Sequence, residues 1–133
     1  MKIQVLGVIF CILIFSGLFP LILPIHMDCC VDEGEVTEAM VSTIGEALAL
    51  FREDVGRYPE NEEGLIALWE QPKNAENWKG PYLKKKGILN DPWRREFRYQ
   101  KIGQGYRLYS LGKDGKANGM GEDRDIETRI QPK

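Results

Sequence analysis

The feature that most constrains this 133-residue chain is an apolar run near its amino terminus, residues 3–27. The run carries no formal charge when His26 is neutral, and its centre, residues 8–19, is dense in isoleucine, leucine, valine and phenylalanine. A helix needs about 20 consecutive apolar residues to cross the hydrocarbon core of a bilayer. We therefore predict a membrane anchor over residues 1–28 and a separate domain outside the bilayer over residues 29–133.

A cleaved signal peptide is the competing interpretation of this run. The run is long for a signal peptide, and no clear small-x-small cleavage site precedes Asp28, so a retained anchor is favoured. Pro20 and Pro24 are expected to kink or end the helix near its outer end. Lys2 precedes the run and several carboxylates follow it, so the positive-inside rule predicts a cytoplasmic amino terminus.

Residues 32–54 repeat apolar side chains at intervals of three and four, which is the period of an amphipathic helix. Gly56 and then Pro59 are the usual signals for the end of such a helix. We interpret the apolar stripe as the side of the helix that packs into the core. The stripe consists of Val36, Met40, Ile44, Ala47, Leu48 and Phe51.

Shorter elements are expected after this helix. Residues 62–70 indicate a second, shorter helix, and residues 96–100 and 105–110 alternate in the manner of strands. Residues 102–105 are predicted to join these strands as a hairpin turn, and residues 127–133 to form a tail. The predicted fold class is therefore α+β, with a long amphipathic helix packed on a small antiparallel sheet.

Residues 109–126 are rich in glycine and acidic residues, with little apolar content after Leu111. Glycine permits left-handed turns and close backbone approach, whereas crowded carboxylates repel one another unless a cation lies among them. Ca²⁺ takes carboxylate and carbonyl oxygens in flexible geometry, so we predict a calcium-binding loop, with a solvated acidic loop as the alternative. The EF-hand template fits poorly, because Lys116 occupies its third position. The acidic residues are Asp114, Glu122, Asp123 and Asp125.

The composition argues against several classes of function. A net charge of −2 gives no electrostatic footprint for nucleic acid. A single histidine, His26, nearly excludes a Ser-His-Asp triad or a histidine zinc site. The paired carboxylates Glu62 and Glu63 fall at an exposed helix start, which argues against general acid–base catalysis there. Three cysteines do not make a disulfide framework. The sequence leaves three states open for Cys29 and Cys30, which are free thiols, a cross-link between chains and lipid attachment. We predict that the chain is not an enzyme.

Six ordered motifs between residues 55 and 126 resemble one protein family, and the resemblance covers about residues 36–126. The matching segments, with the family's pattern after each, are residues 55–59 (N-G-x-Y-P), 63–68 (T-x-Q-G-L-x-A-L), 78–83 (W-x-G-P-Y-L), 91–93 (D-P-W-G), 109–115 (Y-S-L-G-x-D-G) and 121–126 (G-E-D-A-D-I). Together they resemble the globular domain of the major pseudopilin, the G subunit, of type II secretion systems.

The resemblance implies a pseudopilin-like domain with one Ca²⁺ in its closing loop. Carried over to this chain, the calcium ligands are the carbonyl of Leu111 and the side chains of Asp114, Asp123 and Asp125. The resemblance also implies a single-pass protein of the inner membrane, with the amino terminus in the cytoplasm and the carboxyl-terminal domain in the periplasm. Its implied partners are other pseudopilins or secretion-system subunits, including copies of itself in a filament.

The amino terminus departs from the family pattern. Members of the family begin with a basic leader, a glycine at the cleavage site and an F-T-L-x-E start, whose glutamate lies inside the apolar helix. Here residues 3–27 contain no glutamate, and neither Gly7 nor Gly17 is followed by that start. Two alternatives therefore accompany the pseudopilin hypothesis: a non-polymerising, anchored accessory or adaptor protein, and a secreted calcium-stabilised binding domain.

Overall fold

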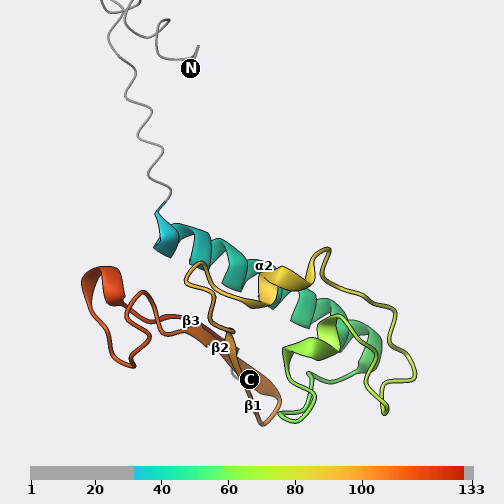
Figure 1. Cartoon of the computed structure of the whole chain (residues 1–133). Coiled ribbons are helices and arrows are strands. Elements are labelled where there is room, and N and C mark those ends of the chain that lie inside the picture. The colour runs from blue at the N-terminus through green and yellow to red at the C-terminus, as the bar shows by residue number, and fades with distance from the viewer. Residues whose placement is uncertain (1–31, 131–133) are drawn as a thin grey trace, which may run out of the picture. The chain divides into compact units, whose positions relative to one another are not determined.

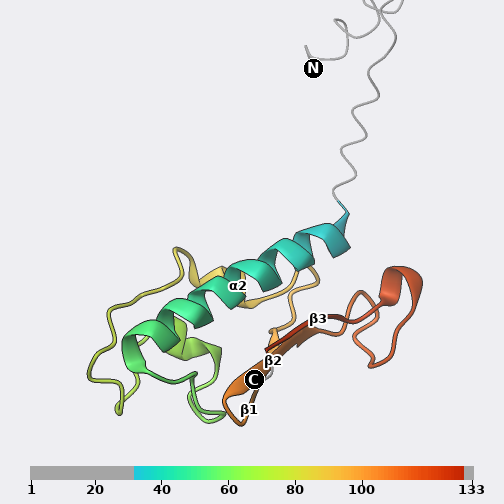
Figure 2. The same ribbon diagram turned by 180° about the vertical axis from the view of Figure 1, so that it is seen from behind.

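A long helix and a small sheet form the two layers of the domain. The computed structural model describes residues 32–130, so the predicted anchor over residues 1–28 lies outside the described range, as do Cys29 and Cys30. Helix α2 (Glu33–Val55) crosses one face of a three-stranded antiparallel sheet of order β1-β2-β3 (Figure 1). The strands are β1 (Arg98–Ile102), β2 (Gly105–Ser110) and β3 (Ile126–Ile130). The same two layers are seen from behind in Figure 2, and they confirm the predicted α+β architecture.

Both ends of α2 follow from local sequence. The side chain of Asp32 caps the first turn by accepting a hydrogen bond from the Gly34 amide at 2.8 Å, and Glu33 and Glu35 lie where the helix dipole favours negative charge. At the other end, Gly56 adopts a left-handed conformation (φ 83°) and donates its amide to the Arg52 carbonyl. The helix predicted for residues 32–54 is confirmed almost to the residue. Within residues 32–130 no helix has both the length and the apolar content to span a bilayer.

The buried face of α2 agrees with the predicted stripe in its second half and differs in its first. Ile44, Ala47, Leu48 and Phe51 are buried as expected. Nearer the amino terminus, Thr37 and Val41 take the fully buried positions, whereas Val36 and Met40 are only half-buried. The Thr37 hydroxyl donates to the Glu33 carbonyl at 2.6 Å, so its burial leaves no unpaired polar group.

The hairpin prediction is confirmed, but the sheet has one strand more than predicted. Strands β1 and β2 pair from Arg98↔Tyr109 to Ile102↔Gly105, with Gly103 and Gln104 in the turn. The expectation of a tail over residues 127–133 is wrong for its described part, because β3 pairs with β2 in antiparallel register. Ile126 is the buried residue of β3, and α2 packs beside that strand. This packing explains why the buried face shifts in the first half of α2.

The connection between α2 and the sheet contains short 3₁₀ turns. The helix predicted for residues 62–70 is wrong in type, because only the turn η2 (Leu65–Leu68) forms there, after Gly64 at φ 56°. Trp78 packs against the core and donates its indole N–H to the Ala67 carbonyl at 2.9 Å. The other 3₁₀ turns are η3 (Lys86–Leu89) and η4 (Gly121–Asp123).

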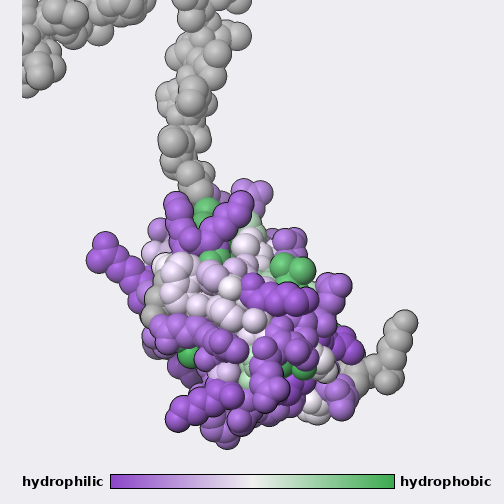
Figure 3. Space-filling view, turned by 90° about the vertical axis from the view of Figure 1, so that its right-hand side faces the viewer, coloured by the Kyte–Doolittle hydropathy of each residue, from purple (hydrophilic) through white to green (hydrophobic). Residues whose placement is uncertain are grey.

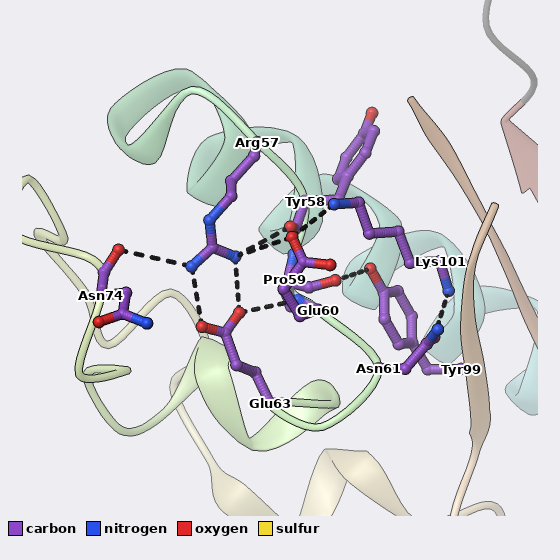
Figure 4. Close-up of polar contacts among 9 residues, drawn as sticks. All are labelled: Arg57, Tyr58, Pro59, Glu60, Asn61, Glu63, Asn74, Tyr99 and Lys101. Atoms are coloured by element: carbon purple, nitrogen blue, oxygen red, sulfur yellow. Dashed lines mark hydrogen bonds and ion pairs between the residues drawn. The ribbon is translucent and has the colours of Figure 1, made fainter. Parts of the chain in front are cut away.

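A polar cluster ties this connection to β1 (Figure 4). Arg57 makes two parallel hydrogen bonds to the Glu63 carboxylate, at 2.6 and 2.8 Å, and this guanidinium lowers the pKa of Glu63 below its usual value. The Tyr99 hydroxyl donates to the Pro59 carbonyl, and the Lys101 amide donates to the Asn61 side chain. These bonds hold the segment just before η2, residues 59–61, against β1 at the edge of the sheet.

Polar side chains and scattered apolar ones make up the exposed surface of the domain. The face seen in Figure 3 is largely hydrophilic, with small separate apolar patches. The large apolar side chains that remain exposed lie on different elements: Leu50, Ile66, Ile102, Met120 and Ile130. Such scattered exposure is normal for a domain in water.

Candidate metal-binding loop

The glycine-rich acidic segment, residues 111–125, connects two neighbouring strands. It leaves β2 after Ser110 and returns at Ile126, and these two residues pair across the sheet. The ends of the loop are therefore fixed next to each other by the β2–β3 ladder. The loop lies at the end of the domain where α2 begins, as both ribbon views show (Figure 1, Figure 2). An ion pair between Arg124 and Glu38 of α2 joins the two.

Asp125 shows the feature that best fits a bound cation. Its Oδ2 accepts a hydrogen bond from the Asn118 amide at 3.0 Å. Its Oδ1 is buried and has no hydrogen-bond partner among the described residues. A buried carboxylate oxygen without a partner is costly, and coordination of a hard cation such as Ca²⁺ would satisfy it.

The other predicted ligands are spread through the loop. Asp114 is exposed, and its Oδ1 accepts from the Lys116 amide at 2.9 Å within a local turn. Asp123 is half-buried at the end of η4, and Leu111 is half-buried where the loop leaves β2. Within residues 32–130, no three side chains of His, Cys, Asp or Glu come together as a metal-ligand cluster. The four-ligand set therefore stays a prediction.

Close backbone packing explains two of the loop glycines. Gly112 has a positive φ of 62°, and a Cβ atom there would collide with the carbonyl oxygen of Arg124. A Cβ atom on Gly119 would collide with the carbonyl oxygen of Asp123. The start and the middle of the loop thus both approach the backbone of residues 123–124, which is the kind of close approach that glycine permits.

Sequence patterns did not identify Asp91 and Arg95, which hold the start of the loop and the end of β2. The Asp91 carboxylate is almost fully buried and accepts from the Ser110 hydroxyl and the Arg95 amide, both at 2.8 Å. The Arg95 side chain donates to the backbone carbonyls of Gly112 and Lys113. The turn signal at residues 90–92 could have suggested a structural Asp91, whereas no local pattern marks Arg95.

The loop has the chemistry of a structural cation site. It offers carboxylate and carbonyl oxygens, the ligand atoms that Ca²⁺ prefers, and both of its ends are tied to one ladder. A cation held there would link the β2 side of the loop to the β3 side.

Comparison with known proteins gives one consistent result. Residues 31–129 match the family described as "Type II secretion system (T2SS), protein G". The chain is 34% identical over 97 residues to the type II secretion system core protein G of Xanthomonas campestris pv. campestris, covering 71% of this chain and 65% of the relative's length. It is 38% identical over 103 residues to the core protein G of Pseudomonas aeruginosa, covering 71% of each.

Among solved structures, the domain is similar to the major pseudopilin from the type 2 secretion system of enterohaemorrhagic Escherichia coli. The TM-score is 0.58 at 28% sequence identity, and the match covers 71% of this chain and 84% of the other. This similarity indicates a common fold.

Proposed function

The chain belongs to the protein G family of type II secretion systems, and from this premise we propose that it acts as a calcium-stabilised, membrane-anchored pseudopilin of such a system. The role is structural and not enzymatic, in agreement with the family. The fold supports it, because a long helix on a small sheet is also the architecture matched in the major pseudopilin.

Calcium stabilisation rests mainly on Asp125, whose buried Oδ1 has no hydrogen-bond partner in the described part of the chain. In this proposal the carbonyl of Leu111 and the side chains of Asp114, Asp123 and Asp125 hold one Ca²⁺. The ion supplies positive charge that offsets the repulsion among the carboxylates. The chain's own residues supply the framework, because the β2–β3 ladder brings Leu111 and Asp125 to neighbouring strand ends.

The proposed anchor and location rest on the sequence. Residues 3–27 are apolar and uncharged over a length sufficient for a bilayer, and charge asymmetry favours a cytoplasmic amino terminus. The domain then lies in the periplasm, next to an inner membrane crossed once. Its partners are other pseudopilins or secretion-system subunits, including further copies of this chain.

A second candidate is an anchored accessory protein that does not polymerise. The observation that favours it is the absence of glutamate from residues 3–27, where the family carries a glutamate inside its apolar helix. Cross-linking of the full chain in membranes separates the two candidates. A ladder of self-cross-linked species supports the pseudopilin, and an exclusively monomeric or heteromeric pattern supports the accessory protein.

Thermal unfolding of the full chain in detergent tests the calcium site. A ligand that binds only the folded state stabilises by about 2.7 kcal/mol at a concentration one hundred times its Kd. We expect Ca²⁺ to raise the Tm of the wild type and of Glu122→Gln, an exposed loop control, but not that of Asp125→Asn. An identical Tm in Ca²⁺ and in excess chelator would refute calcium binding.

Fractionation and mass spectrometry test the anchor. We expect the protein in the inner-membrane fraction. An intact mass that retains residues 3–27 supports a retained anchor. Loss of all residues up to about 27, with the protein released to the periplasm, would instead support the secreted domain.

A further inference from the structure

The Arg95 side chain places a positive charge against the first part of the loop, residues 112–116. One of its terminal nitrogens, Nη2, donates to the Gly112 carbonyl and, at 3.3 Å, to the Lys113 carbonyl. The other, Nη1, lies so close to Gly115 that a Cβ atom there would collide with it. The guanidinium therefore occupies the concave side of this turn, between the carbonyls that precede Asp114 and the glycine that follows it.

The guanidinium is itself held by its surroundings. Its Nε lies 3.5 Å from Oδ2 of Asp91, a carboxylate only 1% exposed. Asp91 in turn accepts from the Ser110 hydroxyl on β2 and from the Arg95 amide. The Trp93 ring lies 5.6 Å from the guanidinium carbon, a distance at which a cation–π contact is favourable. Asp91 and Trp93 of the turn at residues 91–95 thus both contact the guanidinium, while its buried Nε makes no hydrogen bond within the described residues.

The charges around this turn explain why a cation is needed there. The Gly112 and Lys113 carbonyls point toward the guanidinium, while the Asp91 carboxylate lies on its other side. Two carbonyl dipoles directed at a buried carboxylate would repel it without an intervening positive charge. Arginine suits this position, because its guanidinium stays charged at every physiological pH and its Nη2 alone donates to both carbonyls.

We propose that Arg95 is a built-in cation that folds residues 112–116 before any metal binds, and so positions Leu111 and Asp114 for the ion. Arg95 is a positioning residue in this scheme and not a ligand. Its partner carbonyls lie next in sequence to those two predicted ligands. The part that concerns the ion rests on the calcium site proposed above, whereas the folding of the turn by Arg95 does not.

Removing the side chain should weaken calcium binding without removing any ligand. When only a fraction of molecules has the competent loop, the apparent Kd rises by the inverse of that fraction. If Arg95→Gln leaves about one molecule in ten with the turn formed, the apparent Kd for Ca²⁺ rises about tenfold. At saturating Ca²⁺ the loop refolds, because the ion selects the competent form.

Hydrogen exchange of the full chain in detergent, in excess chelator and in saturating Ca²⁺, is the direct test. In chelator we expect Arg95→Gln to speed exchange of the amides at residues 112–118 about tenfold or more, with α2 amides unchanged. Arg98→Gln, the same substitution at an exposed β1 residue, should match the wild type. Arg95→Lys should show an intermediate rate, because it retains the charge and loses the planar guanidinium that carries Nη2.

Each outcome of these experiments tests a separate part of the proposal. Unchanged exchange of residues 112–118 in Arg95→Gln, measured in chelator, would overturn the role of Arg95 whatever calcium does. Faster exchange with an unchanged apparent Kd would overturn the link to the ion. A wild type that ignores Ca²⁺ would refute the calcium site, while the chelator comparison still tests Arg95. If Arg95→Gln loses protection in α2, the same comparison is made with Arg95→Lys, and a wild-type rate there refutes the proposal.

Discussion

Two leucines on α2 offer a matched test of which helix face is buried. Leu48 is fully buried in the core, and Leu50, two positions further on, is 50% exposed. Leu→Ala removes three carbons from either site, and at about 0.8 kcal/mol for each buried carbon the transfer loss at Leu48 is roughly 2.4 kcal/mol. The cavity left behind brings the expected cost of Leu48→Ala to about 3–4 kcal/mol. At Leu50 the expected cost is below about 1 kcal/mol.

The pair is informative because other contributions cancel. Both substitutions occur in the interior of one helix, so the helix propensity of alanine changes equally in both. The expected difference is a large fraction of the 5–15 kcal/mol that stabilises a typical domain. It corresponds to a drop in Tm of roughly 4–8 °C per kcal/mol for a domain near this size.

Urea unfolding followed by far-UV circular dichroism measures the difference, with Ca²⁺ held constant for both variants. Equal urea dependence of the two transitions would show that the midpoints report stability and not a changed unfolded state. A difference below about 1 kcal/mol between Leu48→Ala and Leu50→Ala would refute the assigned packing of α2 on the sheet.

Three further predictions concern backbone strain and protonation. Arg94 has a positive φ of 66° where the family motif D-P-W-G has glycine. Arg94→Gly relieves about 1–2 kcal/mol of strain and adds about 0.5–1 kcal/mol of unfolded-state entropy. The variant should therefore be up to about 1.5 kcal/mol more stable, and a lower Tm would contradict this. Because Arg57 lowers the pKa of Glu63 in the folded state, the stability from this pair is present above the unfolded pKa and is lost as pH falls through the folded one. Arg57→Gln should therefore flatten the acid limb of a Tm–pH curve, and an unchanged limb would exclude the pair as its source. Burial raises the pKa of Tyr106 to about 12 in the folded state. The stability that the neutral Tyr106 contributes is therefore complete below the ordinary tyrosine pKa of about 10 and is lost as pH rises through 12. Tyr106→Phe should keep more of its stability between about pH 10 and pH 12, as alkaline unfolding curves will show.

The elements that sequence patterns predicted well are those with local causes. The cap at Asp32 and the left-handed Gly56 define both ends of α2 within a few residues of each signal. The β1–β2 hairpin likewise depends on a two-residue turn, with Gly103 at φ 56°. In each case the physical reason for the structure lies inside the segment that adopts it.

The elements that were missed depend on distant contacts. Strand β3 is short and follows a polar loop, and its burial at Ile126 comes from packing beside α2. The helix predicted near Leu65 fails because Gly64 turns the chain sharply at φ 56°. Arg95 carries no local signal, since the carbonyls it contacts lie 17 and 18 residues further along the chain.

The candidate site was predicted in part for the same reason. Residue types located the loop, because glycines and carboxylates in one segment exclude a core element. Only the structure distinguishes Asp125, whose buried Oδ1 has no hydrogen-bond partner within residues 32–130, from the exposed Asp114.

Two side-chain contacts link the start of α2 to other parts of the domain, and they have a mechanical consequence. The Trp93 indole N–H donates to the Glu33 carboxylate at 2.8 Å, and Arg124 of the loop pairs with Glu38. A force applied to the chain at residue 32 acts on these two contacts before it acts on the buried contacts of Leu48. The stiffness of the loop that carries Arg124 therefore helps to set how far this end of the helix yields under tension.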